Sequence, residues 1–411
     1  MDKELEKQPN GLWQRYRNLS PTVFALSLVS FLNDTSSEII YPLLPTFLAL
    51  TLGAGPFAIG LIEGFAESIA SILKLFSGYL SDKFGNRKLP VFLGYSLAAV
   101  VRPLLAFVTS WPQVLVVRMT DRIGKGIRGA PRDALLASTV PENARGLAFG
   151  FNRAADHLGA VVGPVVAFLL LTYLAADPST PTAREYQQVF LFASIPVAIG
   201  LFVIVFFVRE KKKPAPDPDE LPLKFSLRGF DSNFKQFLVV VALFTLSNST
   251  DAFLLLRAQE TGVAPAMLPL LWMVLHFSKL FSSIIGGDLS DKIGRKTLIL
   301  TGWVIYALVY AGFAFADSAW QAWTLFIIYG FYFGLTEGVE KALVADLVTE
   351  EKRGTAFGLY NLAYGITVFP ASLIFGFVWS EFGAAPAFLM SAVISVVASL
   401  FLLTIKADRK K

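Results

Sequence analysis

Long apolar stretches decide what this chain can fold into. Residues 237–246 and 392–405 contain no charged side chain, and similar stretches follow one another along the sequence. A helix that crosses a bilayer needs roughly 20 mostly apolar residues. Only 16% of the residues are charged and 54% are hydrophobic, whereas soluble domains carry about 25% charged residues. The sequence therefore predicts an all-α membrane protein, because it lacks the alternating segments typical of a transmembrane β-barrel.

The apolar stretches predict twelve transmembrane helices, at 21–49, 55–80, 89–109, 112–138, 146–173, 187–208, 236–260, 264–288, 296–315, 319–347, 354–379 and 384–405. Basic residues gather in alternate connections between these spans, and the opposite set of connections contains Arg184 and almost no other basic residue. Cytoplasmic loops of membrane proteins carry an excess of Lys and Arg. We therefore expect a multi-pass protein of the cell membrane with both termini in the cytoplasm.

The same reasoning divides the chain into five parts. Residues 1–20 form a charged cytoplasmic tail without the apolar core of a cleavable signal peptide. Residues 21–208 and 236–405 each form a six-helix bundle, and residues 406–411 form a second cytoplasmic tail. Residues 209–235 contain the stretch EKKKPAPDPDELP, whose charge and proline content are typical of a linker between the bundles.

Composition and the absence of known motifs exclude several classes of function. The chain has no Cys, so disulfides, thiolate metal sites and thiol redox chemistry are excluded. The two His, His157 and His276, have no metal-ligand spacing, and we interpret them as packing residues. No P-loop or nucleophile elbow is present, so we expect neither an enzyme nor a cofactor. The expected partners are a small-molecule substrate, protons and the lipid bilayer, with no nucleic acid, and the expected state is a monomer.

Two sequence stretches occur twice at nearly the same offset. GYLSDKFGNRK at 78–88 corresponds to GDLSDKIGRK at 287–296, and ENARGLAFGF at 142–151 corresponds to EEKRGTAFGL at 350–359. Each pair lies in corresponding loops of the two halves. The halves are therefore predicted to be a parallel repeat, related by a pseudo-two-fold axis along the membrane normal.

The repeated loop resembles the loop 2–3 motif of the major facilitator superfamily, which recurs in loop 8–9. The resemblance covers essentially the whole chain and implies a secondary transporter that works by alternating access. Its aspartates, at helix ends, can accept hydrogen bonds from an arginine or from a helix N-terminus and so latch the bundles in one conformation. The alternative that the charges only anchor the loops stays open. The predicted latch consists of Gly78, Asp82, Gly85, Arg87, Asp291 and Lys296.

Several polar and ionisable residues fall inside predicted spans. Such groups cost several kcal/mol in lipid unless they face a cavity or a partner. We predict that they line a proton-coupling or substrate cavity, and the alternative that the span-four charges only hold helices together is left open. Glu340 and Lys341 are instead expected at a cytoplasmic helix end. The predicted cavity residues are Asp34, Glu38, Glu67, Asp121, Arg122, Arg153, Asp156, Asn248, Asp251 and Asn361.

Two further stretches resemble motifs of the same superfamily. RIGKGIRGA at 122–130 resembles its span-four motif, which implies that Arg122 faces the cavity and takes part in proton exchange with a carboxylate such as Asp34, Glu38 or Glu67. GAVVGP at 159–164 resembles its antiporter motif but lacks the final glycine pair. Gly159, Gly163 and Pro164 are predicted to allow close packing and a bend.

The leading functional hypothesis is a secondary transporter that exports a small organic solute by proton coupling. The alternative is a proton-coupled symporter or exchanger for an anionic metabolite, favoured by the cations Arg102, Arg122, Lys125 and Arg153. A receptor or lipid-handling protein that does not cycle is a less favoured alternative, because a static protein has little use for two latches.

Overall fold

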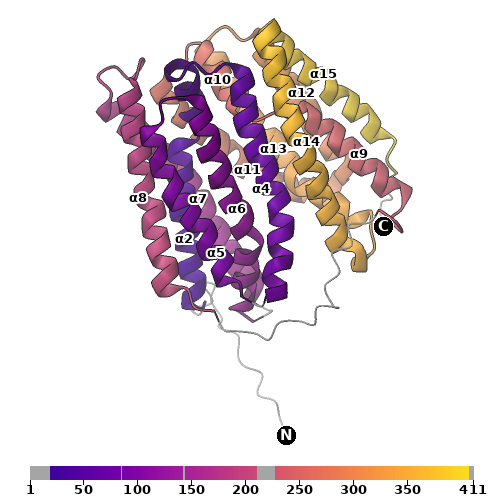
Figure 1. The fold of residues 1–411 in the computed structure, drawn as a ribbon. Helices are drawn as coiled ribbons and strands as arrows, with labels where there is room; N and C mark the ends of the chain where they lie inside the picture. The colour runs from indigo at the N-terminus through magenta and orange to yellow at the C-terminus, as the bar shows by residue number, and fades with distance from the viewer. Residues whose placement is uncertain (1–18, 85, 142–143, 211–226, 407–411) are drawn as a thin grey trace.

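The structure, a computed structural model, describes residues 19–84, 86–141, 144–210 and 227–406 (Figure 1). Within these ranges the side chains at 78–84, 284, 287, 288, 291 and 351 are not described. The described chain forms twelve membrane-spanning segments, as predicted. In chain order they are α2 (Pro21–Ile40) with α3 (Leu44–Thr46) and η1 (Phe47–Thr51); α4 (Pro56–Phe84); α5 (Lys88–Val101) with η2 (Arg102–Phe107); α6 (Trp111–Ser138); α7 (Arg145–Leu174); α8 (Ala183–Phe207); α9 (Ser232–Ser247) with α10 (Ala252–Glu260); α11 (Leu268–Ile293), preceded by η5 (Pro265–Met267); α12 (Arg295–Phe315); α13 (Ala319–Asp346); α14 (Arg353–Phe382), preceded by η6 (Glu350–Lys352); and α15 (Ala384–Leu403).

Ten of the described segments are long and apolar enough to cross a membrane by themselves. The other two are α6 and α13. Helix α6 carries most of the intramembrane charge of the first half, including Arg118, Asp121 and Arg122. It packs against α4 and α5, and its buried charges Arg118, Asp121 and Arg128 bond to groups of other helices.

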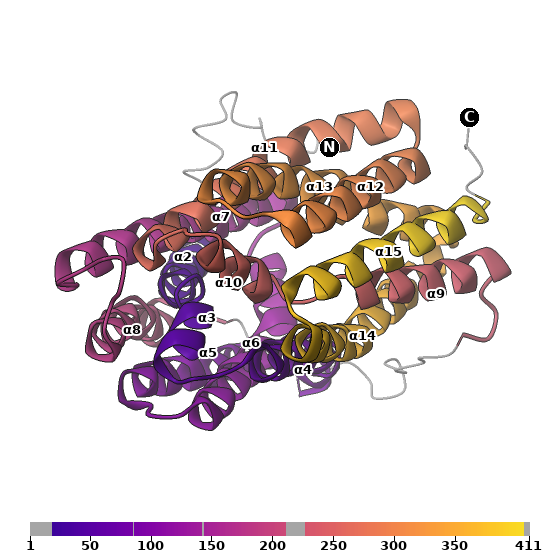
Figure 2. The same ribbon diagram turned by 90° about the horizontal axis from the view of Figure 1, so that it is seen from above.

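The helices form two six-helix bundles whose internal contacts correspond. Helix α2 packs against α7 and α8, and its counterpart α9 packs against α14 and α15. Helix α4 packs against α6 as α11 packs against α13, and α5 packs against α6 as α12 packs against α13. Figure 2 shows the two groups of helices side by side, viewed from above. The bundles are thus related by the pseudo-two-fold axis expected from the sequence repeat.

Three helix boundaries differ from the predicted spans for local reasons. The third span continues past Val101 as a 3-10 turn, because Pro103 has no amide hydrogen for an α-helical bond. Helix α9 begins at Ser232, inside the segment predicted as linker, because the side chain of Asp231 accepts from the Ser232 amide at 2.6 Å. The seventh span, predicted as continuous, is interrupted between α9 and α10. Asn248 there has a non-helical backbone, with φ −92° and ψ 79°.

The bundles touch each other along α4 and α14 and along α7 and α11. At one end the α4–α14 contact is very close, because Gly64 lies against Ser372 and Gly376 lies against Pro56. The Phe57 amide donates to Ser380 Oγ at 3.0 Å, and deeper in the interface Ser68 Oγ donates to the carbonyl of Gly365 at 2.6 Å. The two helices diverge toward the opposite end (Figure 1).

We predict that cysteines at the closed end form a disulfide. The chain has no native Cys, so a Phe57→Cys/Ser380→Cys pair is the only thiol pair present. Oxidation should link the bundles and stop transport, because alternating access requires this end to open. Adding Gly64→Ala should lower the yield, since its new methyl group would lie 2.6 Å from Ser372 Cβ. Gly150→Ala is the control, because nothing lies within 4 Å of that position. Equal yields in both variants would contradict the close packing at Gly64.

Candidate functional site

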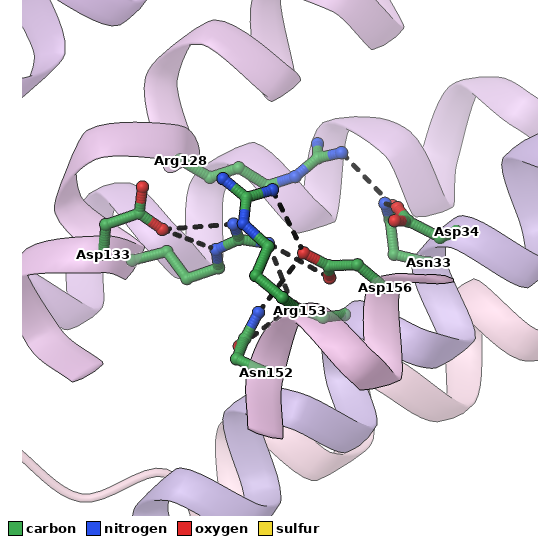
Figure 3. Close-up of polar contacts among 9 residues, drawn as sticks. Asn33, Asp34, Arg128, Asp133, Asn152, Arg153 and Asp156 are labelled. Atoms are coloured by element: carbon green, nitrogen blue, oxygen red, sulfur yellow. Dashed lines mark hydrogen bonds and ion pairs between the residues drawn. The ribbon is translucent and has the colours of Figure 1, made fainter. Parts of the chain in front are cut away.

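Three buried charges of the first bundle form a network around Asn33 of α2. The Arg102 guanidinium donates to Asp121 at 3.0 Å and to the Asn33 carbonyl oxygen at 3.0 Å. Arg128 donates to Asn33 Oδ1 at 3.2 Å, as Figure 3 shows, and stacks over the ring of Tyr95. Arg102, Asp121 and Arg128 are all buried. Asp121, predicted to line the cavity, is therefore buried against Arg102, whose guanidinium joins α2, η2 and α6.

A second buried pair links α4 and α6. Arg118 donates two parallel hydrogen bonds to Glu63, at 2.7 and 2.5 Å. Both side chains are nearly fully buried, and the guanidinium also lies 5.8 Å from the ring centre of Tyr41. A two-point arginine–carboxylate bond is among the strongest hydrogen-bonded arrangements in proteins. It fixes α6 against α4 next to the interface between the bundles.

One turn further along the same helices lies a looser pair. Arg122 Nη1 is 3.7 Å from Glu67 Oε2, and the Glu67 side chain is 35% exposed. Within the described part of the chain, the buried Nε of Arg122 has no hydrogen-bond partner. Lys125 is exposed, and the described residues include no carboxylate within 4 Å of its ammonium group. Arg122 and Glu67, both predicted, are therefore brought together with unused donor capacity beside them.

Helices α2 and α7 meet at the carboxylates predicted in the first span. A methyl group on Gly159 would lie 3.0 Å from Asp34 Cβ, and one on Gly163 would lie 2.7 Å from Glu38 Cβ. Only glycine permits this approach, so the Gly159–Pro164 stretch sets the position of both carboxylates. Asp34 accepts from Asn33 Nδ2 at 3.0 Å (Figure 3).

The charges of α7 pair within the first bundle. Asp156 accepts from Asn152 at 3.3 Å and lies 3.6 Å from Arg153 and 3.7 Å from Arg132 (Figure 3). Asp156 is buried, whereas the Arg153 side chain is 66% exposed. Asp156 is thus largely neutralised, while Arg153 extends into solvent.

Glu38, a predicted site residue of the first bundle, contacts the second bundle. Its Oε2 accepts from the indole nitrogen of Trp272, on α11, at 2.7 Å. His276, one turn further along α11, has its Nε2 3.9 Å from the same oxygen. The ring of Trp272 packs on Tyr41 of the first bundle, with 4.9 Å between centroids. The hydrogen bond of Glu38 therefore depends on the distance between the bundles, because its donor, Trp272, belongs to the other bundle.

Tyrosines of the second bundle hold the break in the seventh span. Tyr306 donates to the Ser247 carbonyl oxygen at 2.5 Å, and Tyr329 donates to Asp251 at 2.8 Å. Asn248 donates to the hydroxyl of Tyr332 at 3.2 Å. Non-helical backbone at membrane depth needs such partners. Asn248 and Asp251, both predicted, are therefore brought together at the break.

In the second bundle, Glu340 is buried and Asn361 is exposed. Glu340 was expected at a helix end, but it is 8% exposed and lies inside the bundle, because Trp303 and Tyr360 from the neighbouring helices cover it. Asn361 is exposed, and its amide donates to the Phe357 carbonyl of its own helix at 2.9 Å. Among the described residues, the Asn361 side chain has no hydrogen bond to the polar groups at the break.

The basic residues of the predicted latch bind helix ends of their own bundle. The Arg87 guanidinium donates to the Ala134 carbonyl at 3.3 Å, and its amide donates to Glu210 at 2.9 Å. Lys296 Nζ donates to the carbonyls of Leu403 at 2.6 Å and Ile405 at 2.8 Å. The latch itself stays a prediction, because the other four members lie outside the described residues or side chains: Gly78, Asp82, Gly85 and Asp291.

Sequence reasoning left out several residues of this site. Glu63 and Glu67 are four residues apart on α4, as Arg118 and Arg122 are on α6, so matched spacing was a usable signal for both pairs. Asn33 and Arg128 gave a weaker signal, since polar residues in apolar spans are expected to find partners. Nothing in the sequence indicated that Trp272 would donate to Glu38.

We predict that the two arginine pairs differ sharply in their effect on stability. Glu63→Gln leaves a buried guanidinium without its countercharge and should cost about 3–5 kcal/mol of unfolding free energy. Glu67→Gln removes a longer, partly exposed pair and should cost about 0–1 kcal/mol. Thermal or denaturant unfolding of the purified variants measures both. Equal losses would show that the bidentate geometry does not carry the stability.

Comparisons with known proteins identify the family. The family model described as Major Facilitator Superfamily matches residues 26–336 and, in a second match, residues 236–411. An uncharacterized MFS-type transporter of Methanocaldococcus jannaschii is 36% identical over 398 residues, which cover 95% of this chain and 96% of the relative. The multi-drug resistance efflux pump PmrA of Streptococcus pneumoniae is 23% identical over 320 residues, covering 75% of this chain and 76% of that protein.

A solved structure has the same fold. The crystal structure of the nucleoside transporter NupG superimposes with a TM-score of 0.77 at 15% identity, covering 93% of this chain and 98% of NupG. The bundles, their repeat and the family model agree. The chain therefore belongs to the Major Facilitator Superfamily and is a multi-pass secondary transporter, not an enzyme.

Proposed function

We propose that the protein exports a small organic solute in exchange for protons, and that Glu38 couples proton binding to the movement of the bundles. The observation that carries the proposal is the 2.7 Å hydrogen bond from Trp272 of the second bundle to Glu38 of the first. Hydrogen bonds to an ionised acceptor are roughly twice as strong as neutral ones. Protonation of Glu38 therefore weakens a contact that exists only while α2 and α11 are close.

The surroundings of Glu38 support a role in exchange. Asp34 lies one turn before Glu38 on α2, and the charges of Asp34 and Glu67 both act on Lys125 of α6. A solute that enters between the bundles competes with protons for these carboxylates, and a positively charged solute does so most directly. The groups that would hold it are the rings of Tyr41 and Trp272 together with the carboxylates.

The direction of transport is part of the proposal. With both termini in the cytoplasm, as the basic loops favour, the closed α4–α14 end faces outward. The divergent end then faces the cytoplasm, where exposed charges such as Lys125 and Arg153 are found. Export is supported by the Gly159–Pro164 stretch and by the similarity to an efflux pump.

We predict that Glu38→Gln abolishes solute-linked proton release. The purified protein is placed in weakly buffered detergent, and tetraphenylphosphonium is added as the probe. The wild-type protein should release protons, and Glu38→Gln should release none while still unfolding at a similar temperature. Asp317→Asn, an exposed acid in a loop at the closed end, is the control and should behave as wild type. Full release by Glu38→Gln, or its loss only in Asp34→Asn, would contradict the assignment to Glu38.

A second candidate function is exchange of an organic anion, favoured by one specific observation. Lys125 has no carboxylate within 4 Å among the described residues, and the neighbouring Arg122 has an unused buried donor. Together they offer two positive groups on one face of α6, the arrangement that a carboxylate ligand requires.

The same assay with benzoate as the probe tests this second candidate. Under this reading, benzoate binds the wild-type protein, and its apparent affinity falls about tenfold or more in Lys125→Gln, which corresponds to about 1.4 kcal/mol. Tetraphenylphosphonium should then cause no proton release. Lys125→Arg, which keeps the charge, is the matched control. Benzoate binding that is equal in all three proteins would exclude Lys125 from the site.

A further inference from the structure

The buried carboxyl groups of the two bundles have different hydrogen-bond and ion-pair partners. In the first bundle the buried acids Glu63, Asp121 and Asp156 each lie within 4 Å of an arginine. In the second bundle the buried acid among the described residues is Glu340 of α13, and the described residues place no lysine, arginine or histidine nitrogen within 4 Å of its carboxyl group. Its two oxygens accept from neutral donors only, Trp303 Nε1 at 3.0 Å and the Tyr360 hydroxyl at 2.7 Å.

Among the described residues, the charged or titratable groups that act on Glu340 come from α13 and α14. From its own helix these are Glu337, Lys341 and Tyr332, and from α14 they are Tyr360 and Tyr364. Helix α12 contributes the neutral indole of Trp303. Lys341 is half exposed, and its ammonium group pairs with Glu337 at 3.6 Å. The nearest cation is thus engaged elsewhere and faces solvent.

Burial without a countercharge makes the ionised form of a carboxyl group costly, whereas the neutral acid is tolerated when its hydrogen bonds are made. The two donors fit both forms. An indole N–H can only donate, so Trp303 fixes Oε1 as an acceptor. A tyrosine hydroxyl can donate or accept, so Tyr360 can donate to a carboxylate or accept the proton of a carboxylic acid.

We propose that Glu340 is a proton-binding site of the second bundle, separate from Glu38. The bound proton lies between Glu340 Oε2 and the Tyr360 hydroxyl, and its arrival reverses the direction of that hydrogen bond without moving the side chains. The geometry keeps α12, α13 and α14 joined at this point in both states. That Glu340 serves transport rests on the proton coupling proposed above, whereas proton binding itself does not.

A row of hydroxyl and amide groups leads from this site toward the break in the seventh span. Tyr332 lies on the same helix as Glu340, and the two groups are electrostatic neighbours. The Tyr332 hydroxyl accepts from Asn248 at 3.2 Å. The ring of Tyr332 stacks on that of Tyr329, which donates to Asp251. Tyr332, about two helical turns from Glu340 on α13, thus interacts electrostatically with the proposed proton site and by a hydrogen bond with the break.

Infrared difference spectroscopy of the purified full-length protein tests the proposal directly. Spectra are recorded between acid and alkaline buffer, in water and in deuterium oxide. The wild-type protein should show a C=O stretching band of a protonated buried carboxyl that Glu340→Gln loses. Glu337→Gln is the matched control, since Glu337 is half exposed on the same helix and paired with Lys279 at 2.8 Å and with Lys341. It should keep the band. An unchanged band in Glu340→Gln would overturn the proposal.

Two further variants separate this outcome from misfolding and from the proposed function. Tyr360→Phe should keep the band but shift its frequency, because the hydroxyl facing Oε2 is gone, and an unshifted band would contradict the placement of the proton. Glu38→Gln should keep the band even where it abolishes proton release with tetraphenylphosphonium. Loss of the band in Glu38→Gln would show that the signal belongs to Glu38 and would also overturn the proposal.

Discussion

The cost of placing charge inside a membrane-spanning bundle governs this structure. An uncompensated ion in a span costs several kcal/mol, and α6 carries several of them. The bidentate bond between Arg118 and Glu63 shows how the cost is met, since both partners leave water but saturate each other. These bonds connect α6 to α4, and the bond between Asp121 and Arg102 connects α6 to η2. Charges that would be costly in lipid therefore bind α6 to its neighbours in the first bundle.

The two bundles descend from one repeat but meet this constraint with different chemistry. The first uses arginine–carboxylate pairs and the second uses hydroxyl and indole donors around Asp251 and Glu340. An arginine pair fixes the ionised state of its acid, whereas a neutral donor allows either state. The first bundle is therefore suited to rigidity and the second to changes of protonation. Glu38 is intermediate, since it belongs to the first bundle and takes its donor from the second.

The sequence predicted the twelve spans and the repeat because both depend on local apolar length and on matching loops. It named Glu67 together with Asp34 and Glu38 as a possible partner of Arg122, and the structure places Glu67 3.7 Å from Arg122. It left open whether Asp121 lines a cavity or pairs with neighbouring helices, and it did not predict the partner of Glu38 or the burial of Glu340. These depend on how each helix is rotated about its axis and on which side chains its neighbours present. A polar stretch such as Ser247–Asp251 was visible, but whether it would break the helix depended on the tyrosines that hold the freed backbone.

The break in the seventh span has a mechanical consequence. Helix α10 is joined to α9 by residues outside any helix, and it packs against α3 and α4 of the other bundle. The span is therefore jointed, and α10 can swing while α9 stays packed against α14 and α15. Opening of the closed α4–α14 end then has two separate degrees of freedom, a rocking of whole bundles and a local swing of α10. A swing of α10 before the bundles rock would let a solute leave before the whole molecule changes conformation.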